Sequence, residues 1–332
     1  MSRSQLTSTD QQNSGGAVAP YVAGKNKIIN GDFGIWQRGT SFSLSNGVNF
    51  TADRWIGYQN AATNTVSQQA FTPGTAPVAG YESAYFWRWS QTGSGTSTQE
   101  IQQKIEDVRT FAGQTVTLSF WAKASSAVPF TGIQLVQNFG TGGSSSVTAL
   151  NFGASSNLTT SWVRYTFTGT VASIAGKTLG AGNNLYVTIQ FSSANTVNID
   201  LWGVQLEAGS VATPFTTATG TLSGELAACQ RYYEKSYNQS VAPGSTTGAT
   251  FVYDLYAGQG RTSSSFKVAK RTVATITLYS PSNGSAGYID VGGGPVTGNV
   301  NAPSENGFST YTSSGYSSAY YVSYNWVASA EL

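Results

Sequence analysis

The sequence has no histidine and a single cysteine, Cys229, among its 332 residues. Without histidine the chain cannot form a Ser-His-Asp or Cys-His catalytic arrangement, an imidazole general base or the commonest zinc sites. A single cysteine excludes both an internal disulfide and a zinc site made of several cysteines. A hydrolase built from this sequence would therefore have to use carboxylates.

Charge is also scarce, because Asp, Glu, Lys and Arg make up 10% of the residues against about 25% in an ordinary soluble protein. The formal net charge is +2, and basic residues form no long run, which disfavours nucleic acid as a partner. No apolar run reaches the length of about 18 residues that a transmembrane helix needs. The first 20 residues lack the apolar core of a secretory signal, so we expect a soluble protein made in the cytoplasm.

Glycine and small polar residues are abundant instead, and aromatic residues reach 13%. Between 25 and 217, short alternating runs are separated by Gly, Ser and Asn clusters, a pattern typical of an all-β sandwich. The clearest strand is 115–122, TVTLSFWA, in which Val116, Leu118 and Phe120 share one face. That face is predicted to lie in the core.

One helix is predicted over 222–236, with Thr221 as its N-cap. Its apolar stripe consists of Leu222, Leu226, Cys229 and Tyr233. The fold class expected is all-β, with two β-sandwich, jelly-roll-like domains joined by this short helix.

The chain is therefore divided into four parts. Residues 1–24 form an arm that is disordered or ordered only by a partner. The others are a jelly roll at 25–217, a junction helix at 218–240 and a β-domain at 241–332.

Several segments together resemble the carbohydrate-binding-module-like jelly roll of bacteriophage tail-fibre and other virion appendage proteins. These are INGDFGIWQRGTSF (29–42), TADRW (51–55), GQTVTLSFWAKAS (113–125) and IDLWGVQLEAGSVATPF (199–215). Further on, ACQRYYEKSY (228–237) and FKVAKRTVATITLYSP (266–281) resemble the helix and β-domain that close many such proteins.

The resemblance implies a non-enzymatic virion protein, made in the host cytoplasm and assembled as a homotrimer. Residues 1–24 would attach it to other virion proteins. A tail-fibre or receptor-binding subunit that contacts host-surface glycans is the first interpretation. A purely structural head fibre, capsid decoration or baseplate protein is the alternative, and a carboxylate-dependent polysaccharide depolymerase is a second one.

In carbohydrate-binding relatives, the N-G-x-F segment and an acid in the last strand flank a structural calcium ion. Here the matching oxygen ligands would be Asn30 and Asp32 with Asp200 or Glu207, which suit a hard cation. Gly34 stands where relatives carry an acid. The other interpretation is that Asn30 and Asp32 cap a turn while Asp200 forms a surface ion pair. No cofactor is required in either case.

Sugar binding in β-sandwiches uses aromatic rings that stack on a pyranose. The candidates are Tyr85, Trp87, Trp89, Trp121, Tyr316 and Tyr320. The alternative is that these rings fill the core or a subunit interface.

Two arginines, Arg38 and Arg54, are near Trp36 and Trp55 in the sequence, so we expect guanidinium groups stacked on indoles. Glu106 and Asp107 are adjacent acids, which point to opposite faces of a strand and so cannot form a glycosidase pair unless the strand breaks there.

Overall fold

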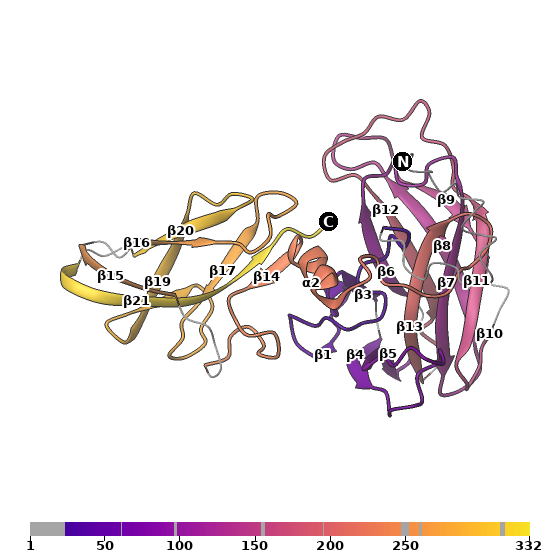
Figure 1. Cartoon of the computed structure of the whole chain (residues 1–332), viewed down its shortest axis with the longest axis horizontal. Coiled ribbons are helices and arrows are strands. Elements are labelled where there is room, and N and C mark those ends of the chain that lie inside the picture. Colours follow the sequence, from indigo (N-terminus) through magenta and orange to yellow (C-terminus); the bar gives the residue numbers. More distant parts are fainter. Residues whose placement is uncertain are drawn as a thin grey trace, which may run out of the picture.

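The computed structural model describes residues 24–332, except 61, 96–97, 154–156, 195, 247–251, 259–260 and 313–315. For 98, 252–258, 261 and 316–320 it describes the backbone alone. The fold class expected from the sequence is confirmed, since the described chain is nearly all antiparallel β with a single helix (Figure 1). The predicted arm, 1–24, lies outside the described residues except for Gly24.

A six-stranded antiparallel sheet forms one layer of the sandwich. Its strand order is β1-β4-β5-β13-β7-β11. The strands are β1 (Ser41–Ser43), β4 (Thr63–Ala70), β5 (Tyr85–Gly93), β13 (Val197–Ala208), β7 (Thr115–Ala124) and β11 (Val163–Thr170).

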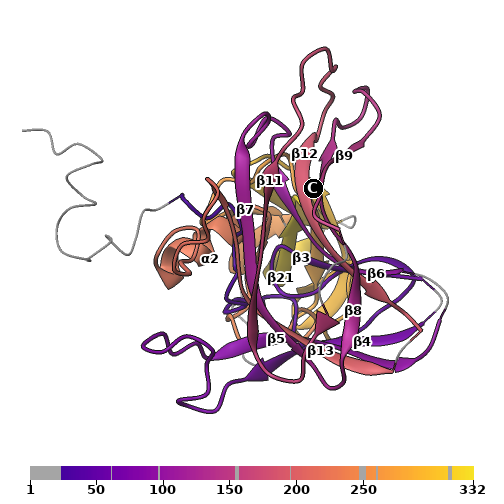
Figure 2. The same ribbon diagram turned by 90° about the vertical axis from the view of Figure 1, so that its right-hand side faces the viewer.

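The second layer is a seven-stranded sheet, ordered β10-β8-β12-β6-β3-β2 with β9 paired to β8. Its strands are β2 (Gly47–Phe50), β3 (Trp55–Gln59), β6 (Thr98–Glu106), β8 (Val128–Asn138), β9 (Val147–Asn151), β10 (Asn157–Leu158) and β12 (Asn184–Ser192). Two loops, 139–146 and 171–183, are joined by the Thr141–Ala181 bridge and rise together at one end of the sandwich (Figure 2).

The core of the sandwich lies between these two sheets. Val116, Leu118 and Phe120 of β7 are fully buried there, as their alternation predicts. The opposite face of β7 is covered too, because Trp121 packs with Trp202 and other rings outside the six-stranded sheet. This second layer of aromatic residues was not expected from the alternation.

The helix α2 (Leu222–Gln230) begins where predicted, with the Thr221 hydroxyl accepting a hydrogen bond from the Gly224 N–H at 3.1 Å. It ends earlier than predicted, because Tyr233 pairs with Ser329 and starts a strand, β14 (Tyr233–Lys235). Aromatic residues favour strands when a partner strand is available. That pairing across almost a hundred residues replaces the last turns of the expected helix.

An eight-stranded antiparallel sheet follows the helix, in the order β14-β21-β18-β19-β20-β16, with β15 and β17 also paired to β21. The strands are β15 (Val252–Gly258), β16 (Arg261–Ser265), β17 (Thr275–Tyr279), β18 (Tyr288–Val291), β19 (Gly294–Asn301), β20 (Gly307–Thr312) and β21 (Tyr316–Ser329). Figure 1 shows β21 running along this body, with α2 between it and the sandwich. Its own core includes Leu278, Ile289 and Trp326.

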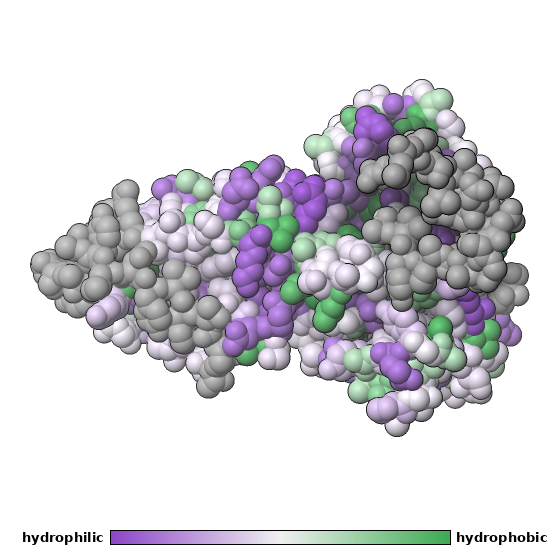
Figure 3. All heavy atoms as spheres, in the orientation of Figure 1, coloured by the Kyte–Doolittle hydropathy of each residue, from purple (hydrophilic) through white to green (hydrophobic). Residues whose placement is uncertain are grey.

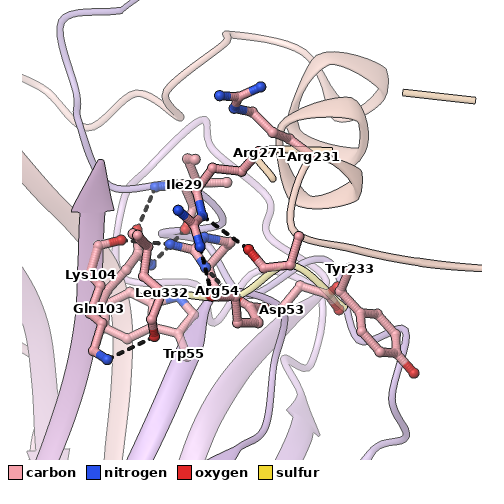
Figure 4. Close-up of polar contacts among 12 residues, drawn as sticks. Ile29, Asp53, Arg54, Trp55, Gln103, Lys104, Arg231, Tyr233, Arg271 and Leu332 are labelled. Atoms are coloured by element: carbon pink, nitrogen blue, oxygen red, sulfur yellow. Dashed lines mark hydrogen bonds and ion pairs between the residues drawn. The ribbon is translucent and has the colours of Figure 1, made fainter. Parts of the chain in front are cut away.

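The sandwich and the eight-stranded sheet meet at a polar junction (Figure 4). Glu331 pairs with both Arg38 and Arg54, and the Lys104 ammonium donates to the Leu332 carbonyl at 2.7 Å. A band of hydrophilic side chains crosses the face shown in Figure 3 at this level.

Both arginines of the junction stack on aromatic rings, but these rings are not the expected indoles. The Arg38 guanidinium lies 3.7 Å from the ring centre of Tyr233, and that of Arg54 lies 3.4 Å from Tyr232. Tyr232 lies between α2 and β14 and Tyr233 is the first residue of β14, so each stack links the two bodies. The expectation of Arg–Trp stacking is therefore wrong in its partners, while the structural role is the one expected.

Candidate functional site

Two neighbouring cavities, of about 430 and 410 Å³, share Gly34, Tyr85 and Leu222 in their linings. We call the pair the Tyr85 groove. The side chains that characterise it are those of Asp32, Trp36, Tyr81, Glu82, Tyr85 and Leu222. They come from the turn that opens the sandwich, from the loop before β5 and from the first turn of α2. Each volume falls in the range of ordinary ligand sites, about 300–1,000 Å³.

The turn at 30–33 holds Asp32 in place. Asn30 and Phe33 both have φ of 56°, a conformation that asparagine tolerates better than most residues. At Gly31 an added Cβ would collide with the carbonyl oxygen of Val204 on β13. Gly31 is therefore required for this close approach to the last strand of the sandwich.

One compartment of the groove is mainly apolar. Trp36 lies at its base, with its indole N–H donating to the Phe33 carbonyl at 2.7 Å and its ring stacked on Phe42. Tyr85, at the first position of β5, is 37% exposed, and Leu222 is 71% exposed on the first turn of α2. The rings are thus held by the fold while apolar surface stays open to a ligand.

The other compartment is acidic. The pKa of Asp32 is raised to about 6, because burial disfavours the charged carboxylate and the carboxylate of Glu225 lies nearby. The Glu82 carboxylate accepts a hydrogen bond from the Gly74 N–H at 3.1 Å. The Tyr81 ring packs edge-on against Trp202 at 5.5 Å. This compartment combines carboxylate oxygens with an aromatic ring fixed by the outer aromatic layer.

Of the aromatic residues predicted to bind glycans, Tyr85 lies in the groove. Trp87 and Trp89 have no exposed surface, and their indole N–H groups donate to Thr51 and Asn64 inside the sandwich. The prediction that they line a glycan surface is corrected: both rings point between the two sheets, whereas Tyr85 is at the end of the strand.

Trp121 is 9% exposed and belongs to the outer aromatic layer, where the Arg164 guanidinium lies 4.5 Å from the centre of its ring. That face of the indole is therefore covered by a cation and not open to a sugar. The side chains of Tyr316 and Tyr320 lie outside the described residues.

The oxygen ligands proposed for calcium do not fit a shared site. The side-chain oxygen of Asn30 accepts from the Ile35 N–H at 3.0 Å, and its amide nitrogen donates to the carbonyls of Ile35 and Asp53. The Asn30 side chain thus caps its own turn, as the alternative interpretation proposed.

Asp200 also has other partners. Its carboxylate accepts two hydrogen bonds from Arg88, at 2.6 and 2.8 Å, and lies 3.7 Å from the Lys123 ammonium. Glu207 accepts from Thr213 and pairs with Lys25. In the part of the chain that is described, no three His, Cys, Asp or Glu side chains gather as a metal site would require.

A second polar surface, on the outer face of the seven-stranded sheet, was not anticipated. Its half-buried side chains include Tyr58, Glu100, Gln102, Tyr186 and Gln190, with the buried Thr188 among them. Glu100 accepts from Gln102 at 2.6 Å and from Thr188 at 2.8 Å. The alternation in TQEIQQKIE (98–106) predicts which of its residues share one face of the strand. Which residues of the neighbouring strands lie beside them depends on the strand register, which the alternation does not give. Tyr81 was missed because its loop has no periodic pattern.

Comparisons with known proteins give limited similarity. No family model matches the chain, and no curated protein matches it. Among solved structures, a CBM4 module is 20% identical, with 55% of this chain and 99% of that chain covered and a TM-score of 0.35. The enzymatically active domain of tailspike protein 4 from bacteriophage CBA120 is 16% identical, with 56% of this chain but only 22% of that chain covered and a TM-score of 0.35.

A Stig cyclase from Fischerella is 14% identical, with 57% of this chain and all of that chain covered and a TM-score of 0.39. The names of these three structures describe a CBM4 module, a tailspike enzymatic domain and a cyclase, and thus three different kinds of protein. At this identity and TM-score, similarity assigns no function. No described helix is long and apolar enough to span a bilayer.

Proposed function

We propose that the protein is a non-enzymatic bacteriophage virion subunit that contacts host-surface glycans, and that the Tyr85 groove is its glycan-binding site. One observation supports this binding site. The partly exposed Tyr85 ring lies between an apolar compartment and the two carboxylates of Asp32 and Glu82. A pyranose presents an apolar face and a rim of hydroxyl groups. The ring of Tyr85 suits the face, and the carboxylate oxygens suit the hydroxyl groups.

The groove is supported rigidly, which favours binding because little ordering is needed when a ligand enters. Trp36 is fixed by a hydrogen bond and a ring contact, and Tyr81 by the outer aromatic layer. A groove built from strand ends and one helix also stays open at the surface, as a polysaccharide chain requires.

A depolymerase is less well supported. Glu106 is paired with Arg231 at 3.1 Å, and Asp107 is paired with Arg109 at 3.0 Å. Both carboxylates are thus held by guanidinium groups, and neither lines the Tyr85 groove. The proposal is therefore binding without cleavage.

The test is a glycan array probed with the intact protein, together with a reducing-end assay on any polysaccharide that binds. Binding without release of reducing ends supports the proposal. Absence of binding to any host-surface glycan favours the purely structural virion protein, and release of reducing ends favours the depolymerase.

Attachment to the virion through 1–24 and assembly as a homotrimer belong to the same proposal. Light scattering of the purified chain tests the trimer, and cryo-electron microscopy of a virion that carries the protein tests its position. If the chain is a monomer and is absent from virions, the proposed virion attachment and trimer are contradicted. Glycan binding is tested separately by the array.

A further inference from the structure

We propose that the Tyr85 groove selects glycans that carry a free, protonated amino group and rejects glycans that carry carboxylate or phosphate groups. This inference rests on the proposed function, because it specifies which glycan the groove would take.

The charged side chains of the described lining are Asp32 and Glu82, and both are acidic. A uronic or sialic acid would place a third carboxylate beside them, with partial loss of water from all three. Like charges brought together in this way oppose binding. An ammonium group in the same place would be attracted by both carboxylates.

Asp32 itself lacks a cationic partner among the described residues. Its carboxylate accepts a long hydrogen bond, 3.4 Å, from the Gly34 N–H and another from its own backbone N–H. The nearby charge that affects it most is the carboxylate of Glu225, which raises its pKa further. A half-buried acid in this setting gains from a positive charge that the described residues do not supply.

Glu225, in contrast, already has its partners. Its carboxylate accepts from the Asn30 N–H at 2.7 Å, and from the backbone N–H and hydroxyl of Thr219 at 2.7 and 2.9 Å. It therefore acts as a fixed negative charge behind Asp32, and it is not available to a ligand.

The aromatic rings of the groove add to the same preference. Tyr81 and Tyr85 line the acidic compartment together with both carboxylates. The face of a tyrosine ring attracts an ammonium group, and the attraction grows when water is partly excluded. The tyrosine rings and the carboxylates thus both favour a positively charged ligand group in one cavity of about 410 Å³.

This selection depends on pH in a defined direction. The groups that face the ligand are Asp32, Glu82, Tyr81 and Tyr85, with Glu225 behind them. Binding of the amino sugar should strengthen as pH rises through about 6, where Asp32 becomes ionised. It should weaken again when the amino group of the sugar loses its proton.

The experiment compares three tetrasaccharides by titration calorimetry with the intact protein, at about pH 6.5 where the amine is still largely protonated. They are the glucosamine tetramer, its fully N-acetylated counterpart and the galacturonic acid tetramer. We expect the glucosamine tetramer to bind at least about tenfold tighter than the acetylated one, and the uronic acid to show no binding. Equal affinity for the first two, or binding of the uronic acid, overturns the inference.

Two variants separate charge selection from the fold. Asp32→Asn should lower the ratio between the first two ligands severalfold, and Glu305→Gln, an exposed acid on the loop before β20, should leave the ratio unchanged. An unchanged ratio in Asp32→Asn overturns the inference. If neutral glycans bind on the array but the glucosamine tetramer does not, only the inference fails, whereas absence of all glycan binding refutes the proposed function itself.

Discussion

The Glu225 carboxylate of α2 accepts a hydrogen bond from the backbone N–H of Asn30 at 2.7 Å. These residues are 195 positions apart in the chain. The contact joins the first turn of the sandwich to the helix that leads into the eight-stranded sheet. It also sets the charge beside Asp32, so the same contact contributes to both the fold and the groove.

Replacing Glu225 should destabilise the protein. In Glu225→Ala the N–H groups of the buried Asn30 and the half-buried Thr219 lose their acceptor, and a buried donor without a partner costs about 1–3 kcal/mol. We expect the free energy of unfolding in urea to fall by about 3 kcal/mol in total. Glu305→Ala is the matched control, and an equal effect of the two substitutions would contradict this role.

Glu331 should hold the two bodies together. Glu331→Gln removes the carboxylate that pairs with Arg38 and Arg54, and the Arg54 side chain is only 1% exposed. A buried charge left without its partner costs about 3–5 kcal/mol. We expect lower stability in urea and faster hydrogen exchange in β14 and the paired end of β21.

The control for that variant is Asp107→Asn, which breaks an ion pair with Arg109 at the surface. Exposed pairs contribute about 0–1 kcal/mol. If Glu331→Gln behaved like Asp107→Asn, the junction would not depend on this carboxylate.

Asp32 should make the protein less stable at neutral pH than an uncharged residue would. Its pKa is about 6 in the folded protein, against about 3.9 in an unfolded chain. Because the folded state holds the proton more tightly, stability falls as pH rises from about 4 through 6. Asp32→Asn removes this loss, so its unfolding free energy should exceed that of the parent by about 2 kcal/mol at pH about 8.

The difference between Asp32→Asn and the parent should shrink toward zero as the pH is lowered to about 4, where the carboxyl group is protonated in the folded state. Urea unfolding at a series of pH values measures it directly. A difference that does not change with pH would show that the charge of Asp32 costs nothing.

Local patterns in the sequence predict much of this fold. The alternation in β7 identified buried Val116, Leu118 and Phe120, and Thr221 was identified as the N-cap from its position. These features depend on residues within one element. The same local reasoning placed Tyr85, Trp87 and Trp89 together, because all three share a face of β5.

What separates these three residues is their position relative to the edge of the sandwich. Trp87 and Trp89 are opposite the second sheet, while Tyr85 is at the strand end beside α2. Likewise, the shorter helix and the stacking of Arg38 on Tyr233 depend on pairing between β14 and β21. Contacts between distant segments, which no local pattern contains, therefore decide which residues form the candidate site.

The most direct test of the account compares Tyr85→Ala with Tyr288→Ala, since Tyr288 on β18 is 41% exposed and has no place in the groove. Affinity is measured by titration calorimetry for the glycan that binds most tightly on the array, with Tyr186→Ala as a probe of the outer face of the seven-stranded sheet. We predict at least about a tenfold loss of affinity in Tyr85→Ala and parental affinity in Tyr288→Ala and Tyr186→Ala. Parental affinity in Tyr85→Ala, with a loss in Tyr186→Ala, would contradict the assignment of binding to the Tyr85 groove.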